Sequence, residues 1–394
     1  MDSYQLLKRS CEEWSTWPSN LLRPDQRRND LENYRFALDA SERQLYQAST
    51  EYVHIIEPSD SPNGYTEQTI ASPIALRKHL QQNRKDPQSS LIFASLCSYY
   101  QIRASFLDTL FSFGYSNEPQ DYHMTSFDSY DTLENHQSSI LEIPQLSRSG
   151  LEHSIQYILR SIEKIPDEGR TGNTTWDIRQ MAVYHKFDFI HGKAFWLIIK
   201  TDNSMSRRMK EAMAEDPIIN SALSKDISGS FAATLRTHLV HLEWCDKSSR
   251  EYIYDIHGEI RKSLKGLKEA QTGKRYDIHS SSPVEHVGSG MQPKTIETNG
   301  LRHSFSCRLT EEIEDLTDLD RLLFRESEKL DSYFEQLETF SLVLQLHRQT
   351  LRDIADHYES LAARDSLPNE MVTRSFYSDL DSFSYRIGRI QKNL

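Results

Sequence analysis

The chain has 394 residues, of which 37% are hydrophobic and 26% are charged, and its formal net charge is −12. This length allows two or three structural units. The acidic balance argues against nucleic acid as a partner, because binding a phosphate backbone requires basic patches. The longest apolar run, residues 194–199, is far shorter than the roughly 18 to 20 residues that a membrane-spanning helix needs.

The cysteines and the N-terminus indicate a cytoplasmic protein. Cys11, Cys97, Cys245 and Cys307 lie far apart and form no Cys-x-x-Cys pair. This spacing favours a reducing compartment over a disulfide scaffold or a zinc knuckle. The first residues, MDSYQLLKRSCEEW, lack the apolar region of a secretory signal.

The first half of the chain alternates between helix-like and strand-like segments. Residues 1–50 predict an N-terminal helical extension of one or two short helices. Residues 51–56 (EYVHII) predict a first strand that ends at the turn-rich PSDSPNG. Residues 89–113 carry apolar side chains at spacings that suit two consecutive buried helices.

The pattern changes to a period of two between residues 151 and 200. The segment HSIQYILRSI alternates at Ile155, Tyr157 and Leu159, which suits a half-buried strand. The segments DIRQMAVYHKFDF and KAFWLIIK flank His191 and Gly192, which predicts a β-hairpin with a glycine turn. A helical period returns after Gly229, so residues 51–265 form the predicted body. Residues 266–306, rich in Gly, Ser, Pro and Thr, are predicted to be a disordered linker.

Residues 307–394 give the strongest pattern in the sequence. Positions seven residues apart carry Leu309, Leu316, Leu323, Leu330, Leu337, Leu344, Leu351 and Tyr358. A sustained heptad spacing predicts a coiled-coil seam along a long helix over 309–362. Between residues 309 and 361 there are 14 acidic and 5 basic residues, so most of the net charge lies here. The seam is equally consistent with packing inside one chain and with self-association into a homo-oligomer.

A second helix is predicted over 368–394, after Pro368, with apolar positions that continue to the last residues. Because it runs to the end of the sequence without a glycine cap, we expect a longer native product. The predicted fold class is therefore α+β: a mixed α/β/α body with a small mixed or antiparallel sheet, followed by a long C-terminal helical stalk or coiled-coil hairpin.

Motifs for catalysis or cofactor binding are not found. No glycine pair has the strand before it and the helix after it that a phosphate-binding loop requires. No serine lies in a Gly-x-Ser-x-Gly elbow, and no cysteine has an evident base. We therefore predict no enzyme, no catalytic residue and no cofactor-binding residue.

Two groups of residues are candidates for metal ligands. His238 and His241 have an i, i+3 spacing that suits metal binding, but without a third ligand we interpret them as one packed and one exposed histidine. His185 and His191 are interpreted as strand and turn residues. Glu311, Glu314, Asp315 and Asp318 place carboxylates on one helix face, which could attract Mg²⁺ loosely, although a solvated helix start explains them better.

Several blocks, in order, resemble the cytosolic N-terminal region of fungal CorA-like transporter proteins. These blocks are SSLIFASLCSYYQIRASFLDTLFSFG (89–114), PQDYHMTSF (119–127), IPQLSRSGLEHSIQYILRSIE (143–163), TTWDIRQMAVYHKFDFIHGKAFWLIIKTD (174–202) and FAATLRTHLVHLEWCD (231–246). The resemblance extends over roughly residues 50–390. It implies an α/β/α cytosolic domain with a mixed sheet, a long stalk helix, pentameric assembly and a link to Mg²⁺ transport.

The chain departs from that family pattern in two ways. It has no membrane helix, and it has no Gly-Met-Asn signature; Gly290, Met291 and Gln292 lie in a polar segment. The resemblance therefore implies a CorA-like cytosolic domain without the pore, with an assembly or regulatory role in divalent-cation transport. It would reach a membrane only through a further C-terminal part or a partner. The alternative is a stand-alone interaction or scaffold protein that uses the heptad stalk to bind partner helices.

Overall fold

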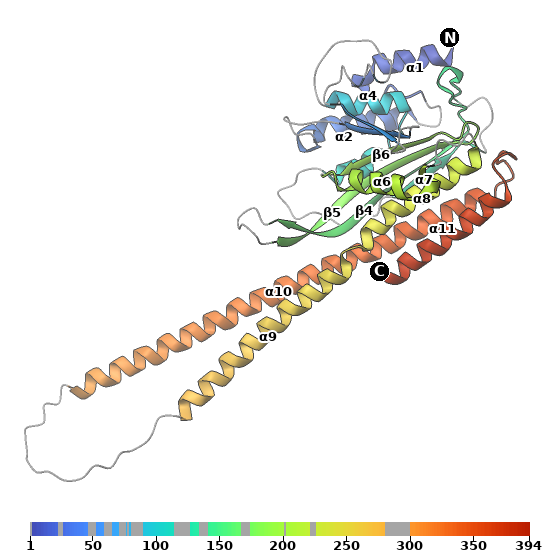
Figure 1. Ribbon diagram of the computed structural model, residues 1–394. Helices are drawn as coiled ribbons and strands as arrows, with labels where there is room; N and C mark the ends of the chain where they lie inside the picture. Colours follow the sequence, from blue (N-terminus) through green and yellow to red (C-terminus); the bar gives the residue numbers. More distant parts are fainter. Residues whose placement is uncertain are drawn as a thin grey trace, which may run out of the picture. The chain divides into compact units, whose positions relative to one another are not determined.

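The computed structural model describes most of the chain (Figure 1). The described residues are 2–22, 27–45, 53–58, 65–70, 76, 79, 90–113, 127–133, 141–166, 174–200, 202–220, 226–279 and 300–394. They form two compact units, unit 1 (Met1–Ser249 with Leu342–Leu394) and unit 2 (Arg250–Ser341). The fold class is α+β, with antiparallel sheets and a long C-terminal helix.

Unit 1 contains all the described strands and most of the helices. In chain order they are α1 (Ser3–Glu12), η1 (Trp14–Thr16), α2 (Arg28–Leu45), β1 (Val53–Pro58), β2 (Tyr65–Ile70), α4 (Ser90–Tyr100), α5 (Phe106–Phe111), β3 (Phe127–Asp131), η3 (Pro144–Leu146), β4 (Glu152–Pro166), β5 (Thr174–Asp188), β6 (Ala194–Lys200), α6 (Ser204–Glu215), α7 (Pro217–Asn220), α8 (Ile227–Asp246) and α11 (Arg374–Asn393). Two more helices, α9 (Ser249–His279) and α10 (Gly300–Ala362), provide unit 2, and the end of α10 belongs to unit 1.

The main sheet of unit 1 has four antiparallel strands in the order β3-β4-β5-β6. The strand predicted at 51–56 is confirmed as β1, which pairs with β2 in a separate two-stranded sheet. The two consecutive helices predicted in 89–113 are confirmed as α4 and α5. The resemblance implied a mixed sheet, whereas every described strand pair is antiparallel.

The central strands β4 and β5 are buried on both faces. Ile155, Tyr157 and Leu159 belong to the first of two hydrophobic cores, which they share with α8, α11 and the end of α10. On the opposite face, Ala182 and Tyr184 belong to a second core with α2, α4 and α5. The prediction of a half-buried strand is therefore wrong, because helices cover both faces of the sheet. Alternating side chains reach both layers since a strand has a period of two.

The β5–β6 hairpin is confirmed, and its turn depends on Gly192. This residue has a φ of +62°, and a Cβ added there would lie 3.2 Å from the Cα of Ile227. The carboxylate of Asp188 accepts hydrogen bonds from the backbone N–H of Ile190 (3.0 Å) and His191 (2.8 Å). The glycine and the Asp188 carboxylate together fix the turn.

The helices after α8 differ in extent from the prediction. Helix α9 continues to His279 and α10 begins at Gly300, so both ends of the predicted linker at 266–306 are helical, and residues 280–299 lie outside the described residues. Helix α11 begins at Arg374 instead of Pro368. The hydroxyl of Thr373 accepts a hydrogen bond from the N–H of Phe376 (3.3 Å), which is an N-cap that the sequence pattern did not indicate.

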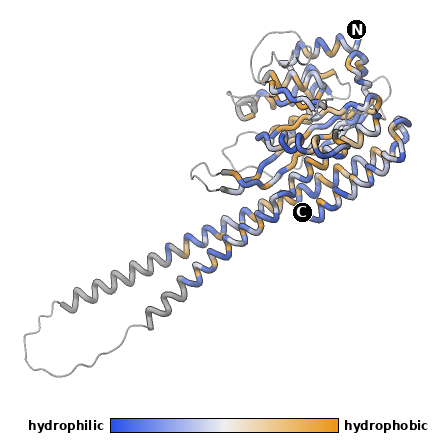
Figure 2. The backbone as a smooth tube through the Cα atoms, in the orientation of Figure 1, coloured by the Kyte–Doolittle hydropathy of each residue, from blue (hydrophilic) through white to orange (hydrophobic). Residues whose placement is uncertain are grey.

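Neither the long helices nor any other helix in the described ranges combines the length and apolar character needed to cross a membrane. In Figure 2, the coloured parts of α9 and α10 are mostly hydrophilic, whereas the strands of the main sheet are rich in hydrophobic residues.

Candidate functional site

Unit 2 is an antiparallel pair of helices formed by α9 and the first part of α10. The rings of Tyr252 and Phe340 pack edge to face with centroids 4.9 Å apart. Both side chains are buried, as is Ile256. Farther along the pair, Glu326 hydrogen-bonds to Lys329 and Ser263, and these bonds lower the pKa of its carboxyl. One stripe of each helix is thus covered by the other helix.

The uncovered sides of this pair carry large hydrophobic residues. Half of the large hydrophobic side chains that are exposed in the described residues lie on unit 2; they are Ile253, Tyr254, Leu264, Phe324 and Phe334. Phe324 and Phe334 expose 65% and 61% of their surface. Ile253 and Leu264 are eleven residues apart, which places them on one face of α9. We call these five residues the hairpin surface.

The two helices of unit 2 carry opposite charge. Residues 261–275 of α9 contain six basic residues and one acidic residue. Residues 311–320 of α10 contain six acidic residues and no basic residue. Lys262 and Lys265 are three-quarters exposed, and they form ion pairs with Glu259 and Glu269 on the same helix. The sequence of unit 2 therefore has a basic segment on α9 and an acidic segment on α10.

The predicted heptad seam has two different environments. Leu351 and Tyr358 are buried in the first core of unit 1, together with Ile354 and Leu361. Leu323, Leu330 and Leu337 are half-buried on unit 2, and Leu344 is half-buried on unit 1. Leu309 and Leu316 lie on the α10 backbone, but their side chains lie outside the described part of the structure.

The acidic candidates for Mg²⁺, namely Glu311, Glu314, Asp315 and Asp318, also lie on the helical backbone of α10 with side chains outside the described part. Among the side chains that are described, no group of three or more His, Cys, Asp or Glu residues is arranged to hold a metal ion.

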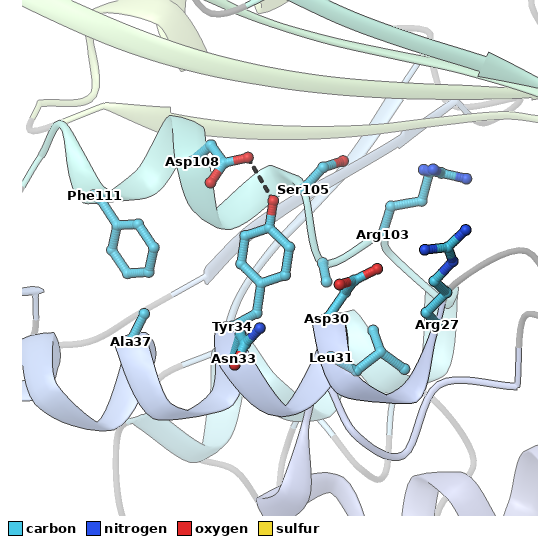
Figure 3. A pocket seen from close by; sticks show the side chains of 11 residues that line it. Arg27, Asp30, Leu31, Asn33, Tyr34, Ala37, Arg103, Ser105, Asp108 and Phe111 are labelled. Carbon is cyan, nitrogen blue, oxygen red and sulfur yellow. Dashed lines mark hydrogen bonds between the residues drawn. The ribbon is translucent and has the colours of Figure 1, made fainter.

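A cleft of about 560 Å³ lies between α2 and α5 in unit 1 (Figure 3). The hydroxyl of Tyr34 donates a hydrogen bond to Asp108 (2.7 Å) across it. Burial and this carboxylate raise the pKa of Tyr34, and burial raises the pKa of Asp108. Arg27, Arg103 and Asp30 line the same cleft. Because both cationic and anionic side chains line the cleft, its charge does not favour one class of ligand over another.

A second cleft of about 600 Å³ lies between β3 and the end of α10. Asp353, Asp356 and His357 line one wall, and Asp131 lines the other. Asp131 forms an ion pair with Arg364 (3.0 Å). Behind this wall, His357 Nε2 lies 3.3 Å from Nδ1 of the buried His153.

The histidines behind that wall form a buried cluster that the sequence analysis did not identify. His238 and His241 are both fully buried on α8, so the expectation of one packed and one exposed histidine is wrong. His185 is a strand residue, as predicted, but it is also fully buried, and His191 lies exposed in the turn. His153 and His347 are buried too. His153 and His185 each lie two residues from a buried apolar residue on the same strand face, Ile155 and Val183, and this period of two was the available signal for their burial.

The comparisons with known proteins give one finding. A family model described as CorA-like transporters matches residues 9–268, which is more than half of the chain. Neither the curated proteins nor the solved structures include a match to the chain.

Proposed function

Because the chain belongs to the CorA-like transporter family, we propose that it assembles with copies of itself through the hairpin surface and regulates divalent-cation transport, with Mg²⁺ as the cation. Family membership supports the connection with transport, and the chemistry of unit 2 supports the assembly. The proposed role is one of assembly or regulation.

The observation that carries the proposal is the combination of exposed hydrophobic residues and opposite charges on unit 2. Five of the ten large hydrophobic side chains that are exposed in the described residues lie on unit 2, and exposed apolar residues of this kind are typical of interaction surfaces. Opposite charge on the two helices favours an antiparallel pairing in which the basic segment of one copy lies beside the acidic segment of another. A second copy is the occupant that satisfies both features at once.

The assembly is tested with the double substitution Phe324→Asp and Phe334→Asp. We expect the wild-type chain to show, by size-exclusion chromatography with light scattering, a mass at least twice the chain mass of 45.9 kDa. The double variant should be monomeric, because two carboxylates would have to be buried in the interface. Phe36, which is 78% exposed on α2, provides the control: Phe36→Asp should leave the mass unchanged. A wild-type monomer over the whole concentration range would contradict the proposal.

The regulatory role is tested by repeating the mass measurement in MgCl₂ and in EDTA. We expect Mg²⁺ at about 10 mM to increase the fraction assembled, since hard cations reduce repulsion among carboxylates. Replacing Glu311 and Glu314 by Gln and Asp315 and Asp318 by Asn should abolish that response. An unchanged Mg²⁺ response in this variant would remove these four residues from the proposal.

The same surface also supports a second candidate function, that of a scaffold that binds helices of other proteins. Exposed apolar residues on a helix pair suit an amphipathic partner helix. The light-scattering experiment separates the two candidates, because a scaffold of this kind would be monomeric in isolation.

A further inference from the structure

Histidines from both helical and strand elements meet in the first core of unit 1. Four of them form a continuous series: His357 on α10, His153 on β4, His185 on β5 and His238 on α8. His357 and His153 are 3.3 Å apart between ring nitrogens. The ring centroids of His153 and His185 are 5.5 Å apart, and those of His185 and His238 are 5.0 Å apart. Of these four, His357 is half-buried and borders the cleft beside β3, whereas the other three are fully buried.

The hydrogen bonds of this series are those of neutral imidazoles. His238 lies between two tyrosine hydroxyls, with Tyr157 at Nδ1 and Tyr358 at Nε2, each at 2.8 Å. The Nε2 atoms of His153 and His185 are buried and have no hydrogen-bond partner in the described structure. An imidazolium donates from both nitrogens. Protonation of either residue would therefore place an N–H and a charge in the core with no acceptor.

The groups around the series oppose protonation. Burial is the largest cause that lowers the pKa of His153, His185, His238 and His357, and the neighbouring histidines lower the pKa of the first three further. The pKa falls to about 3 for His185 and to about 4 for His357.

The charged and titratable groups that face the four histidines come from several elements. They are Tyr157 on β4, His241 and Cys245 on α8, Arg208 on α6, Tyr358 on α10, Arg364 after α10, and Asp353 and Asp356 beside His357 in the cleft. Arg208 lies 3.9 Å from Glu243, and Arg364 is paired with Asp131. From β6, β3 and α11, the aromatic rings of Trp196, Phe127 and Phe383 face the histidines.

We propose that this histidine series is an acid-sensitive switch that releases the layer of α11 and the end of α10 from the main sheet. Protons reach the series at His357, which borders the cleft, and then at His153 behind it. The charged imidazoles repel one another and the nearby arginines. The layer on the opposite face, with α4 and α5, contains none of the four histidines and stays in place.

The direction of the pH dependence follows from the lowered pKa values. The released state has ordinary histidines with a pKa near 6.5, so it binds protons more readily than the packed state. The packed state is therefore fully favoured above about pH 6.5 and loses its advantage as the pH falls below that value. Each participating histidine changes the equilibrium by up to roughly tenfold per pH unit, so four together give a narrow transition.

The switch is tested by hydrogen exchange with mass spectrometry between pH 7.5 and 4.5, corrected for the pH dependence of intrinsic exchange. We expect peptides that cover 347–361 and 376–390 to lose protection together between roughly pH 6 and 5, while peptides in 92–107 keep theirs. Loss of protection in all regions at the same pH would be ordinary acid unfolding and would overturn the proposal. Protection maintained throughout down to pH 4.5 would overturn it as well.

A pair of variants identifies the histidines responsible. The double substitution His153→Gln and His357→Gln removes two titrating groups, so the transition should move to lower pH and become less steep. His191 and His257 are exposed, so the control variant His191→Gln and His257→Gln should match the wild type. Equal shifts in both variants would overturn the proposal. If the first variant does not fold at pH 7.5, proton uptake by the wild type during the transition decides: three or more protons support the switch, and fewer refute it.

Discussion

His238 shows how one buried residue joins three elements of unit 1. Its two ring nitrogens contact Tyr157 on β4 and Tyr358 on α10, and its backbone belongs to α8. Because a neutral imidazole has one donor and one acceptor nitrogen, one tyrosine donates to it and the other accepts from it. The ring therefore satisfies both of its hydrogen bonds without carrying a charge.

We predict that Tyr358→Phe lowers the free energy of unfolding by about 1 to 2 kcal/mol, because a buried nitrogen of His238 loses its partner. Urea denaturation at pH 7.5 measures the change. Tyr385 lies on α11 and is 70% exposed, so Tyr385→Phe is the matched control and should have almost no effect. Equal effects of the two substitutions would contradict the role assigned to His238.

Gly192 gives a second prediction at the scale of one residue. Gly192→Ala should destabilise unit 1 by about 1 to 3 kcal/mol, because φ is positive and the new Cβ would lie 3.2 Å from the backbone of Ile227. A methyl group added at Gly388 on α11 would have no neighbour within 4 Å, so Gly388→Ala should stabilise the protein by up to about 1 kcal/mol. Thermal unfolding of both variants checks the opposite signs.

Sequence reasoning at this scale succeeded with the turn and failed with the histidines. His191 and Gly192 indicate the hairpin because turn chemistry is local. The i, i+3 spacing of His238 and His241 suggests only that they share a helix face. It does not show that Trp196 packs against both rings, with centroids 4.6 Å and 5.2 Å away. That burial is a tertiary property, and no local pattern encodes it.

At the scale of elements, α10 is one helix with one heptad pattern and two kinds of surroundings. Leu351 exposes 2% of its surface in the core of unit 1, whereas Leu330 is half-buried on unit 2. The sequence assigns the two leucines the same position in the repeat. The difference arises because the sheet, α8 and α11 surround the end of the helix, and residues distant in sequence provide them.

The two leucines should therefore respond differently when their side chains are shortened to that of alanine. We predict that Leu351→Ala lowers the free energy of unfolding by about 2 to 5 kcal/mol, through lost burial and the cavity that remains. Leu330→Ala should cost about 1 kcal/mol or less in the isolated chain, because a half-buried side chain loses less contact area. Denaturant titration of the two variants compares them. A larger cost at Leu330 would mean that the seam is more important on unit 2 than on unit 1.

Element types were more predictable than element extents. The strands and helices of the body follow from periods of two and of 3.6 residues. The Gly, Ser and Thr content after residue 266 predicted a linker that begins too early, because α9 continues to His279. The start of α11 was also misplaced, because Pro368 was a more evident signal than the Thr373 cap.

At the scale of the whole molecule, the chain divides where the sequence offers no boundary signal. Unit 2 begins at Arg250, directly after α8, and ends at Ser341 in the middle of α10. A helix that continues through a boundary carries no glycine, proline or change of period there. Such a division depends on where other elements cease to pack, and so it could not be predicted from the residues at 249 and 341.

The charges of unit 2 lead to the last prediction. Lys262→Glu with Lys265→Glu replaces two exposed cations on α9 by anions and should weaken self-association by about tenfold or more, because like charges would then meet across the interface. The two positions are 75% and 77% exposed, so the monomer itself should keep its stability. Sedimentation equilibrium at low ionic strength measures the dissociation constant.

The control for this variant has the same change in net charge at two sites on unit 1. Arg28, whose side chain is 89% exposed, and Lys8, which is exposed on α1, are both replaced by Glu. If association depended only on net charge, both double variants would weaken it equally. If it depends on the α9–α10 hairpin, only the first variant does. The effect of the first variant should also shrink as NaCl is raised toward about 1 M, where the screening length falls to about 3 Å.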